Sequence, residues 1–295
     1  MKKIQIYLSY TFKSTPLFAV VLLFASCQKD IDVKLPAYKE KLVVEASIET
    51  GKTAQVLLSM TAPYFGNVDL SDPTRFFVKG AFITITDGVV VDTLKELDPT
   101  TGYLYLGTKL FGQVGKSYLM TIKYNGDTYT SITNILNPIP LDSVFFKAET
   151  DTFGYAWGHL TDPVGKGNCY RWFAKRITKD QFFVAPFNSA FDDKFIDGTS
   201  FDFSYERPPQ PNERDGYSDQ PHAGYYNIGD TVIIKFCTIG TTEYLFWRSY
   251  YSNKASNGNP FSAPANIQSN ISGGAGVIGA FCGYSPSFDT LIIKK

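Results

Sequence analysis

Cys27 has the sequence surroundings that most clearly point to a chemical reaction, because it follows a short apolar segment near the N-terminus. The first three residues include two lysines, and residues 17–24 form an unbroken apolar run. That run is shorter than the roughly 20 apolar residues that span a bilayer, so it predicts a cleaved export signal. The small residues Ala25 and Ser26 precede the cysteine, an order typical of bacterial lipoprotein signals, in which the thiol receives lipid.

We therefore expect residues 1–26 to be a lipoprotein signal peptide and residues 27–40 to be a polar tether. Three acyl chains on Cys27 would exceed the two membrane signals that stable anchoring requires. The alternative is an ordinary secretory signal beside an unrelated cysteine.

Three further cysteines, Cys169, Cys237 and Cys282, lie in segments with strand character. Free cysteine in a strand behaves as a small buried apolar residue. An exported chain can form disulfides, but three cysteines leave one over and no CxxC pair is present. Three buried thiols are the favoured interpretation, with a single disulfide as the alternative.

Gly274, Gly276 and Gly279 match the spacing of a dinucleotide-binding loop. Such a loop connects a strand to a helix in a βαβ unit, with an acidic residue about 20 positions further on. Only 16 residues follow Gly279, and they continue as another strand. We interpret these glycines as positions of close backbone packing or bulges and expect no cofactor.

Few residues are suited to hydrolytic or metal chemistry. His159 lies in an alternating strand run and His222 in an irregular segment, and no GxSxG nucleophile motif accompanies them. HExxH, paired CxxC and EF-hand patterns are absent, so no metal site is expected, although Asp192-Asp193 could hold calcium. A glycosidase-type carboxylate pair can lie anywhere in a chain. A carboxylate-dependent hydrolase thus stays open as the less favoured alternative to a protein that is not an enzyme.

The charge of the mature chain argues against nucleic acid as a partner. Cleavage before Cys27 removes three of the 28 basic residues and leaves all 28 acidic ones, so 25 basic residues remain and the net charge is −3. With 44% apolar and 16% aromatic residues, the chain can build a packed core.

Seven short β runs without helical periodicity occupy the first part of the mature chain, at 42–48, 54–60, 81–86, 89–94, 103–107, 117–124 and 128–136. Asp87-Gly88 and Asn125-Gly126 are two-residue hairpin signals. The pattern predicts an all-β fold in which residues 41–137 form an immunoglobulin-like β-sandwich. Pro138 and Pro140 cannot donate to a β-ladder, so they mark the expected domain boundary.

Residues 138–295 are expected to form a C-terminal β domain with one short helix. Strands are predicted at 141–148, 155–160, 169–177, 231–238 and 289–293, with further strand character at 277–283. The helix is predicted at 242–252, where Tyr244, Trp247 and Tyr251 share a face.

Within that domain, residues 182–226 form a long loop that is rich in Asp, Pro and aromatic residues. Irregular segments of this length are either functional or disordered, and aromatic content disfavours disorder. Aromatic side chains give a large contact area at low entropy cost. The possible binding loop therefore comprises Phe201, Phe203, Tyr205, Tyr217, Tyr225 and Tyr226. The same residues could instead cover the domain's own core, and both possibilities remain open.

After the lipoprotein start, the chain carries a series of characteristic segments at residues 42–46, 78–88, 117–118, 138–144, 259–262 and 273–279. The order of these features resembles the DUF4249 lipoproteins of Bacteroidota. It implies an outer-membrane lipoprotein associated with a TonB-dependent transporter, without catalytic residues to carry over. Residues 28–32 (QKDID) are similar to the lysine-plus-acidic signal that sends such lipoproteins to the cell surface.

These features together predict an outer-membrane lipoprotein, displayed more on the cell surface than on the periplasmic face, that acts as a non-catalytic binding or accessory module. The alternative from another class is a structural component of an envelope assembly that binds no small molecule.

Overall fold

Short runs of alternating apolar and polar residues form the strands of this protein. In strand β1 (Leu42–Glu49), Val44 and Ile48 are fully buried while Glu45 is exposed, because successive side chains of a strand point to opposite faces. The same alternation recurs in strand β7 (Ser117–Tyr124).

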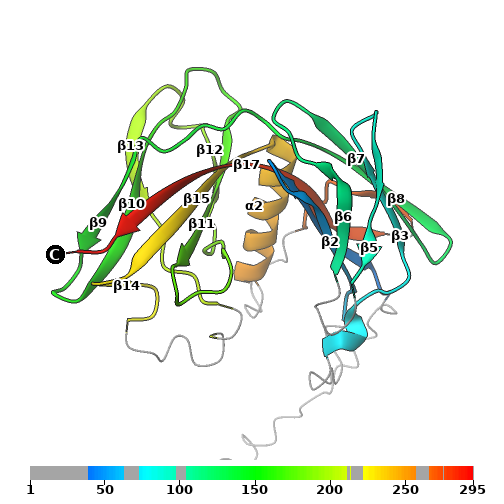
Figure 1. Ribbon diagram of the computed structural model, residues 1–295, viewed down its shortest axis with the longest axis horizontal. Coiled ribbons are helices and arrows are strands. Elements are labelled where there is room, and N and C mark those ends of the chain that lie inside the picture. The colour runs from blue at the N-terminus through cyan, green and yellow to red at the C-terminus, as the bar shows by residue number, and fades with distance from the viewer. Residues whose placement is uncertain are drawn as a thin grey trace, which may run out of the picture. The chain divides into compact units, whose positions relative to one another are not determined.

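The computed structural model describes residues 39–62, 73–97, 104–210, 213, 222–256, 266–274 and 276–294. The residues expected to form the signal peptide, Cys27 and most of the expected tether lie outside the described residues. Glu40–Lys295 is one compact unit. Its described residues form many strands, one α-helix, α2 (Thr241–Ser256), and one 3-10 helix, η1 (Pro73–Phe76) (Figure 1). The expected all-β class with a single short α-helix is confirmed.

The N-terminal part is an immunoglobulin-like sandwich, as predicted. Its strands are β1, β7, β2 (Thr53–Met60), β3 (Phe82–Thr86), β4 (Val91–Thr93), β5 (Lys95–Glu96), β6 (Leu104–Phe111), β8 (Asp127–Asn134) and β16 (Ser272–Gly273). One sheet has the order β16-β8-β7-β3-β4, and the other contains β1-β2-β6-β5. The predicted β7–β8 hairpin turns at Asn125 and Gly126, which both have positive φ, as a type I′ turn requires.

The C-terminal part has two further layers of strands. These strands are β9 (Ser143–Ala148), β10 (Phe153–Thr161), β11 (Cys169–Arg176), β12 (Ala190–Asp192), β13 (Ser200–Ser204), β14 (Tyr226–Asn227), β15 (Thr231–Ile239) and β17 (Val277–Ile292). One sheet has the order β13-β10-β14 with β9 also paired to β10, and the other contains β12-β11-β15-β17. Trp172, Phe236 and Tyr226 belong to the core of this part.

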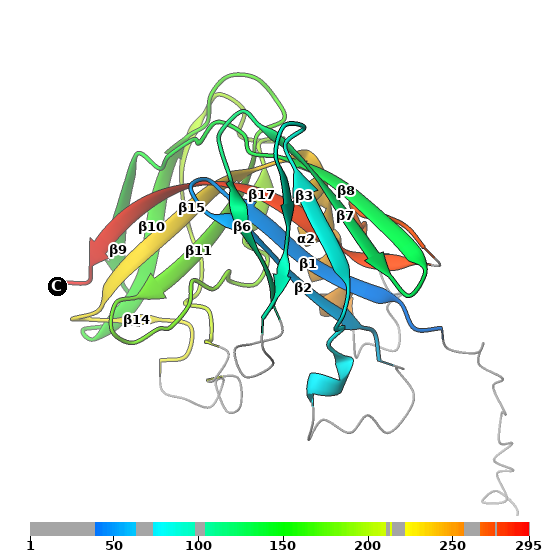
Figure 2. The ribbon, with the colours of Figure 1, turned by 45° about the vertical axis from the view of Figure 1, so that its right-hand side comes forward.

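Strand β17 belongs to both parts and joins them in one eight-stranded sheet, β12-β11-β15-β17-β1-β2-β6-β5. Residues 277–284 pair in parallel with β1, and residues 285–292 pair antiparallel with β15 (Figure 2). Pro286 lies two positions beyond the last pair with β1 and is opposite Cys237 in the pairing with β15. The two segments expected as separate strands are therefore one strand.

The expected domain boundary at residues 137–138 does not divide the chain into two self-contained domains. It separates the sandwich strands β1–β8 from those that follow, but β16 and the first half of β17 return to the sandwich, and Phe281 is buried in its core. Residues 41–137 alone thus lack two of the strands around that core. Sequence pattern could not show this, because pairing between residues more than 200 positions apart leaves no local signal.

Residues 182–226 also contain more regular structure than expected. Strands β12 and β13 lie inside this segment, and β13 pairs with β10 along five residues. The alternation of Phe201 and Phe203 is a strand period, but the Asp and Pro residues around it obscured that signal. A long irregular loop is therefore not the correct description of the whole segment.

Helix α2 packs over a cluster that contains all three described cysteines. Cys169, Cys237 and Cys282 are buried free thiols in this cluster. Burial raises the pKa of Cys169 and of Cys237 to about 12 and that of Cys282 to about 11. The favoured interpretation of these residues as buried thiols agrees with this arrangement.

The first turn of α2 is attached to the sandwich through Glu243. The Thr133 hydroxyl on β8 donates to the Glu243 carboxylate at 2.5 Å and accepts from the Gly283 N–H of β17 at 2.7 Å. Glu243 is only 2% exposed, and desolvation raises its pKa above the ordinary value. The folded state therefore binds a proton more tightly than the unfolded chain does.

This linkage predicts that the Glu243 contribution to stability is complete below about pH 4.3, the ordinary glutamate pKa, and declines as pH rises through the raised pKa. In Glu243→Gln the side chain stays neutral, so this pH dependence should vanish. Urea unfolding of both proteins at pH 4.5 and 7 should show the variant gaining stability relative to the parent as pH rises. A difference between the two proteins that is the same at both pH values would contradict the prediction.

Candidate functional site

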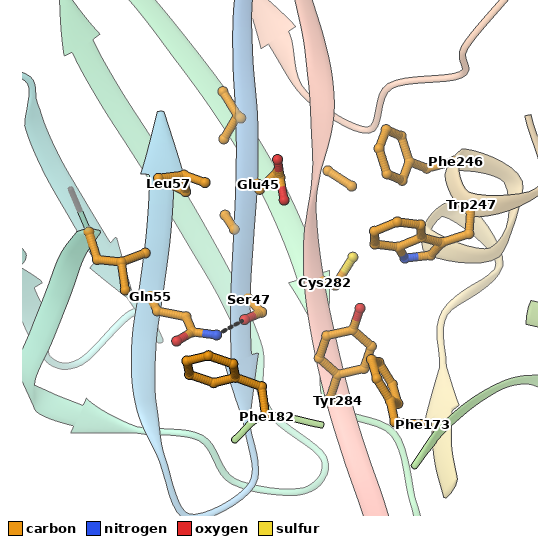
Figure 3. Close-up of a pocket in the computed structure, with 14 residues that line it drawn as sticks. Glu45, Ser47, Gln55, Leu57, Phe173, Phe182, Phe246, Trp247, Cys282 and Tyr284 are labelled. Carbon is orange, nitrogen blue, oxygen red and sulfur yellow. Dashed lines mark hydrogen bonds between the residues drawn. The ribbon is translucent and has the colours of Figure 1, made fainter. Parts of the chain in front are cut away.

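A cavity of about 390 Å³ lies between α2 and the face of the large sheet that points away from the sandwich core (Figure 3). Its position follows from strand alternation. In β1, Leu42, Val44 and Ile48 enter the core, so Glu45 and Ser47 face the cavity. Leu57 and Gln55 of β2 extend the same face, and the Gln55 amide donates to the Ser47 hydroxyl at 3.3 Å.

Aromatic side chains form most of the remaining wall. They come from four separate segments and are Phe173 on β11, Phe182 after it, Phe246 and Trp247 on α2, and Tyr284 on β17. A neighbouring cavity of about 270 Å³ shares Glu45, Phe246 and Trp247 with the first. We call the two cavities together the α2 groove. Its size and mainly apolar lining are typical of small-molecule sites.

Two cations are buried behind this aromatic wall. The Arg171 guanidinium lies 3.3 Å from the centre of the Trp247 ring and 4.7 Å from that of Phe173, and it donates to the Tyr284 hydroxyl. Lys235 forms an ion pair with Glu49 and lies 5.6 Å from the Tyr284 ring. Arg171 is 5% exposed and forms no ion pair with any residue that the structure describes.

The polar atoms at this end of the groove are hydrogen-bond donors. The Trp247 indole N–H and the Tyr284 hydroxyl both lie against the Cys282 sulfur, and the Arg171 guanidinium also interacts with the Tyr251 hydroxyl. The Trp247 indole nitrogen and the Arg171 Nε have no accessible surface, so they lie behind the wall of the groove. Burial raises the pKa of Tyr284 well above its ordinary value, so its hydroxyl keeps its proton. Figure 3 shows the Trp247 nitrogen, the Cys282 sulfur and the Tyr284 hydroxyl turned toward one another.

The aromatic residues of the predicted binding loop lie elsewhere. Phe201, Phe203 and Tyr205 pack against the C-terminal core, where Phe203 meets Trp172 edge-on at 5.6 Å. Tyr226 is 1% exposed in the same core, and the Tyr225 ring makes tilted contacts with the rings of Phe153 and Tyr155. Tyr217 lies outside the described residues. The placement of Phe201, Phe203, Tyr205 and Tyr226 matches the alternative in which the loop aromatics cover the core.

Three carboxylates converge in the loops around β12. Ligand oxygens of Asp162, Asp193 and Asp197 lie within 4.8 Å of one another. Each is also bonded to a neighbouring loop: Asp193 accepts from Gly167 N–H and Asp197 from Gly165 N–H, while Asp162 accepts from Gly198 N–H and the Tyr170 hydroxyl. Asp193 of the acidic pair noted in the sequence belongs to this cluster and Asp192 does not. These hydrogen bonds give the carboxylates a structural role in holding the loops together.

Neither histidine contributes to the groove. The His159 Nδ1 lies 2.7 Å from Asp202 across the β10–β13 pair, and both side chains are exposed to solvent. His222 packs against the Phe153 ring at 4.2 Å. The glycine string lies at and before the start of β17, where Gly279 pairs with Val44. No helix follows it, so its role is close backbone packing, as interpreted from the sequence.

Sequence reasoning missed most of the groove. It placed Trp247 on a helix with Tyr244 and Tyr251, but not beside Arg171 and Tyr284. One signal was available: Arg171 interrupts the run Cys169-Tyr170-Arg171-Trp172-Phe173, in which every other residue is apolar or aromatic. A charged residue inside such a run is either exposed at a sheet edge or buried beside groups that stabilise its charge.

The fold and groove place this chain among all-β proteins that carry a small-molecule-sized cavity on a sheet face. It belongs to the family described as "Domain of unknown function (DUF4249)", whose model matches residues 28–287. No curated protein matches the chain. Among solved structures, a two fibronectin type-III domain segment from chicken tenascin is similar at 13% identity and a TM-score of 0.19, covering 66% of this chain and 88% of that one. Among the described residues, no helix is long and apolar enough to cross a membrane.

Proposed function

We propose that this protein is a non-catalytic binding module whose ligand occupies the α2 groove and whose N-terminus is tethered to the outer membrane by lipid on Cys27. The observation that carries the binding role is the groove itself: a preformed cavity of about 390 Å³ with five aromatic side chains in its wall. Binding sites for small molecules combine such an apolar lining with a few polar groups at fixed positions.

A catalytic role is less well supported by the groove. Glycoside hydrolysis uses two carboxylates that flank the scissile bond. Among the described residues that line the main cavity, Glu45 is the one carboxylate. We therefore retain binding rather than hydrolysis as the proposed function.

The binding role is tested with N-phenylnaphthylamine, a neutral dye that fluoresces in apolar sites, and with residues 28–295 purified without lipid. We expect saturable binding that Ser47→Trp abolishes, because the indole would fill the cavity above β1. Ile132→Trp is the matched control, since it adds the same side chain at an exposed strand position of the other sheet. If Ser47→Trp and Ile132→Trp bind the dye equally well, the groove is not the binding site.

The lipid anchor is tested by Cys27→Ala. Without the thiol no acyl chain can be attached, so we expect the protein to leave the membrane fraction and to partition out of the detergent phase. Mass spectrometry of the parent should find a mature N-terminus at Cys27 carrying acyl chains. A mature N-terminus at another residue would contradict the anchor.

The location and partner follow from the family resemblance and residues 28–32. We propose display on the outer surface of the outer membrane of a member of the Bacteroidota, next to a TonB-dependent transporter. The orientation is tested by adding a protease to intact cells, because a protein on the outer surface is cleaved and one on the periplasmic face is protected. Co-purification from detergent-solubilised membranes tests the partner, and recovery of a multi-protein envelope assembly without any ligand binding would favour the structural alternative.

A further inference from the structure

The floor of the α2 groove follows the paired strands β1 and β17, and its character changes along them. In the parallel register Val43 lies opposite Ile278, and Ser47 lies opposite Cys282 four residues further along. Four residues of a strand span about 13 Å. The groove is therefore long enough to hold the two ends of a small elongated molecule in different surroundings.

The end of the groove at Val43 is mainly apolar. Ile278, Ile267 and Tyr250 line the neighbouring cavity together with Val43. Contact with these side chains stabilises a hydrocarbon in proportion to the apolar area that leaves water. This end of the groove suits the chain of a ligand rather than its polar head.

The other end carries a hydrogen-bonding pair that faces the cavity. The Gln55 amide donates to the Ser47 hydroxyl at 3.3 Å, and both side chains line the main cavity (Figure 3). Gln55 is exposed and Ser47 is partly exposed, so both are accessible to a ligand. The Gln55 carbonyl oxygen is left to accept and the Ser47 O–H is left to donate. A head that both donates and accepts, such as an amide or a hydroxyl, matches this pair.

The charges around the groove disfavour an ionised head of either sign. No lysine, arginine or histidine is among the described residues that line the two cavities, and Glu45 lines both of them. An anionic head therefore meets a like charge and no cation. A cationic head reaches Glu45 only beside Trp247, whose ring centre lies 3.3 Å from the Arg171 guanidinium. Since an ion in an apolar site is unfavourable unless it is paired, a neutral head is favoured.

We infer that the α2 groove binds small neutral amphiphiles, with an uncharged amide or hydroxyl head on Ser47 and Gln55 and an apolar chain that runs along β1 toward Val43. This inference rests on the proposed binding function and names the class of its ligand. The Gln55 carbonyl accepts from the head and the Ser47 hydroxyl donates to it, while Phe246 of α2 packs on the chain.

The experiment measures displacement of N-phenylnaphthylamine from residues 28–295 by molecules that share a heptyl chain: octanamide, 2-nonanone, octanoate and octylammonium. The ketone has the shape of the amide and is more apolar, but its head has no donor. A site that only buries a chain therefore binds the ketone more tightly. We expect the amide to bind about threefold to tenfold more tightly than the ketone, the contribution of one hydrogen bond. It should bind about tenfold or more tightly than either ion, because a buried unpaired charge is unfavourable.

Variants locate the head and the chain. Gln55→Leu removes the acceptor and should reverse the order, so that the ketone binds more tightly than the amide. Asn134→Leu is the matched control, because Asn134 forms the same kind of cross-strand pair with Ser117 at exposed positions outside the groove. Val43→Trp should weaken octanamide more than hexanamide, since the indole fills the space of the longer chain. Circular dichroism checks that each variant is folded, and each displacement is corrected for the dye affinity of that variant.

Each outcome separates this inference from the function beneath it. If the ketone or either ion binds as tightly as the amide, or if nothing displaces a dye that still binds, the inference is overturned and the groove remains a binding site. An amide preference that persists in Gln55→Leu also overturns it, because the head then lies elsewhere. Equal losses for hexanamide and octanamide in Val43→Trp contradict the direction of the chain. Failure of the dye itself to bind overturns both the inference and the proposed function.

Discussion

Replacing Gly279 with alanine is expected to lower the free energy of unfolding by about 4 to 5 kcal/mol, the exceptional end of the range for single substitutions. Gly279 has φ +145° and lies opposite Val44 in the β1–β17 ladder. A Cβ atom there would lie 2.0 Å from the Val44 carbonyl oxygen, which belongs to the backbone of the paired strand. The clash is with backbone atoms, so rotation of a side chain cannot relieve it.

Gly276 provides the matched control within the same glycine string. Its φ of +131° is also unfavourable for alanine, but an added Cβ would meet only the Lys41 side chain at 3.8 Å. Gly276→Ala should therefore lower stability by about 1 to 3 kcal/mol, the contribution of backbone strain alone. Urea denaturation of both variants measures the difference. Equal losses would show that the clash with Val44 is relieved by movement and would refute the argument.

Glu49→Ala should lower the free energy of unfolding by about 3 to 5 kcal/mol, because it leaves the buried Lys235 ammonium without a counter-charge. Lys235 is 7% exposed, and its remaining neighbours include the rings of Phe173 at 5.0 Å and Tyr284 at 5.6 Å. The pair connects β1 of the sandwich to β15 of the C-terminal part. Its loss therefore weakens the junction as well as the pair.

Two further variants check this interpretation by chemical denaturation. Glu49 also binds Lys52 at 2.7 Å, but the Lys52 side chain is 61% exposed. Lys52→Ala should change stability by no more than about 1 kcal/mol, as solvent-exposed pairs do. Combining Glu49→Leu with Lys235→Met removes both charges and should recover most of the loss. If Glu49→Ala and Lys52→Ala are equally mild, the ammonium finds water or another partner and the prediction is wrong.

Sequence pattern predicted those elements whose signals are local. The hairpin at Asn125-Gly126 needed only its turn residues and the alternation of the flanking strands, and it is present. Helix α2 was expected at 242–252 and extends over Thr241–Ser256. Strand β13 was missed because Asp and Pro around Phe201 and Phe203 hid a short alternation.

The groove shows the opposite case. Its wall at one end and the guanidinium behind that wall bring together Arg171, Trp247 and Tyr284, which lie on a strand, a helix and another strand. No spacing in the sequence relates these residues, because their proximity results from β17 pairing with both β1 and β15 while α2 packs across it. The sequence instead favoured the loop aromatics as a binding surface, and four of them, Phe201, Phe203, Tyr205 and Tyr226, pack in or against the C-terminal core.

By itself, then, the sequence determined the all-β class, the sandwich strands within residues 41–137, the single α-helix and the character of Cys27 as a lipidation candidate. Each of these depends on neighbouring residues through turn chemistry, side-chain alternation or a local motif. Only the tertiary structure decided that the last strand joins both parts of the fold and that a buried, unpaired arginine lies behind an aromatic groove. Pairing between distant strands is selected by the burial of whole sheet faces, a free energy that belongs to the folded chain and not to any segment of it.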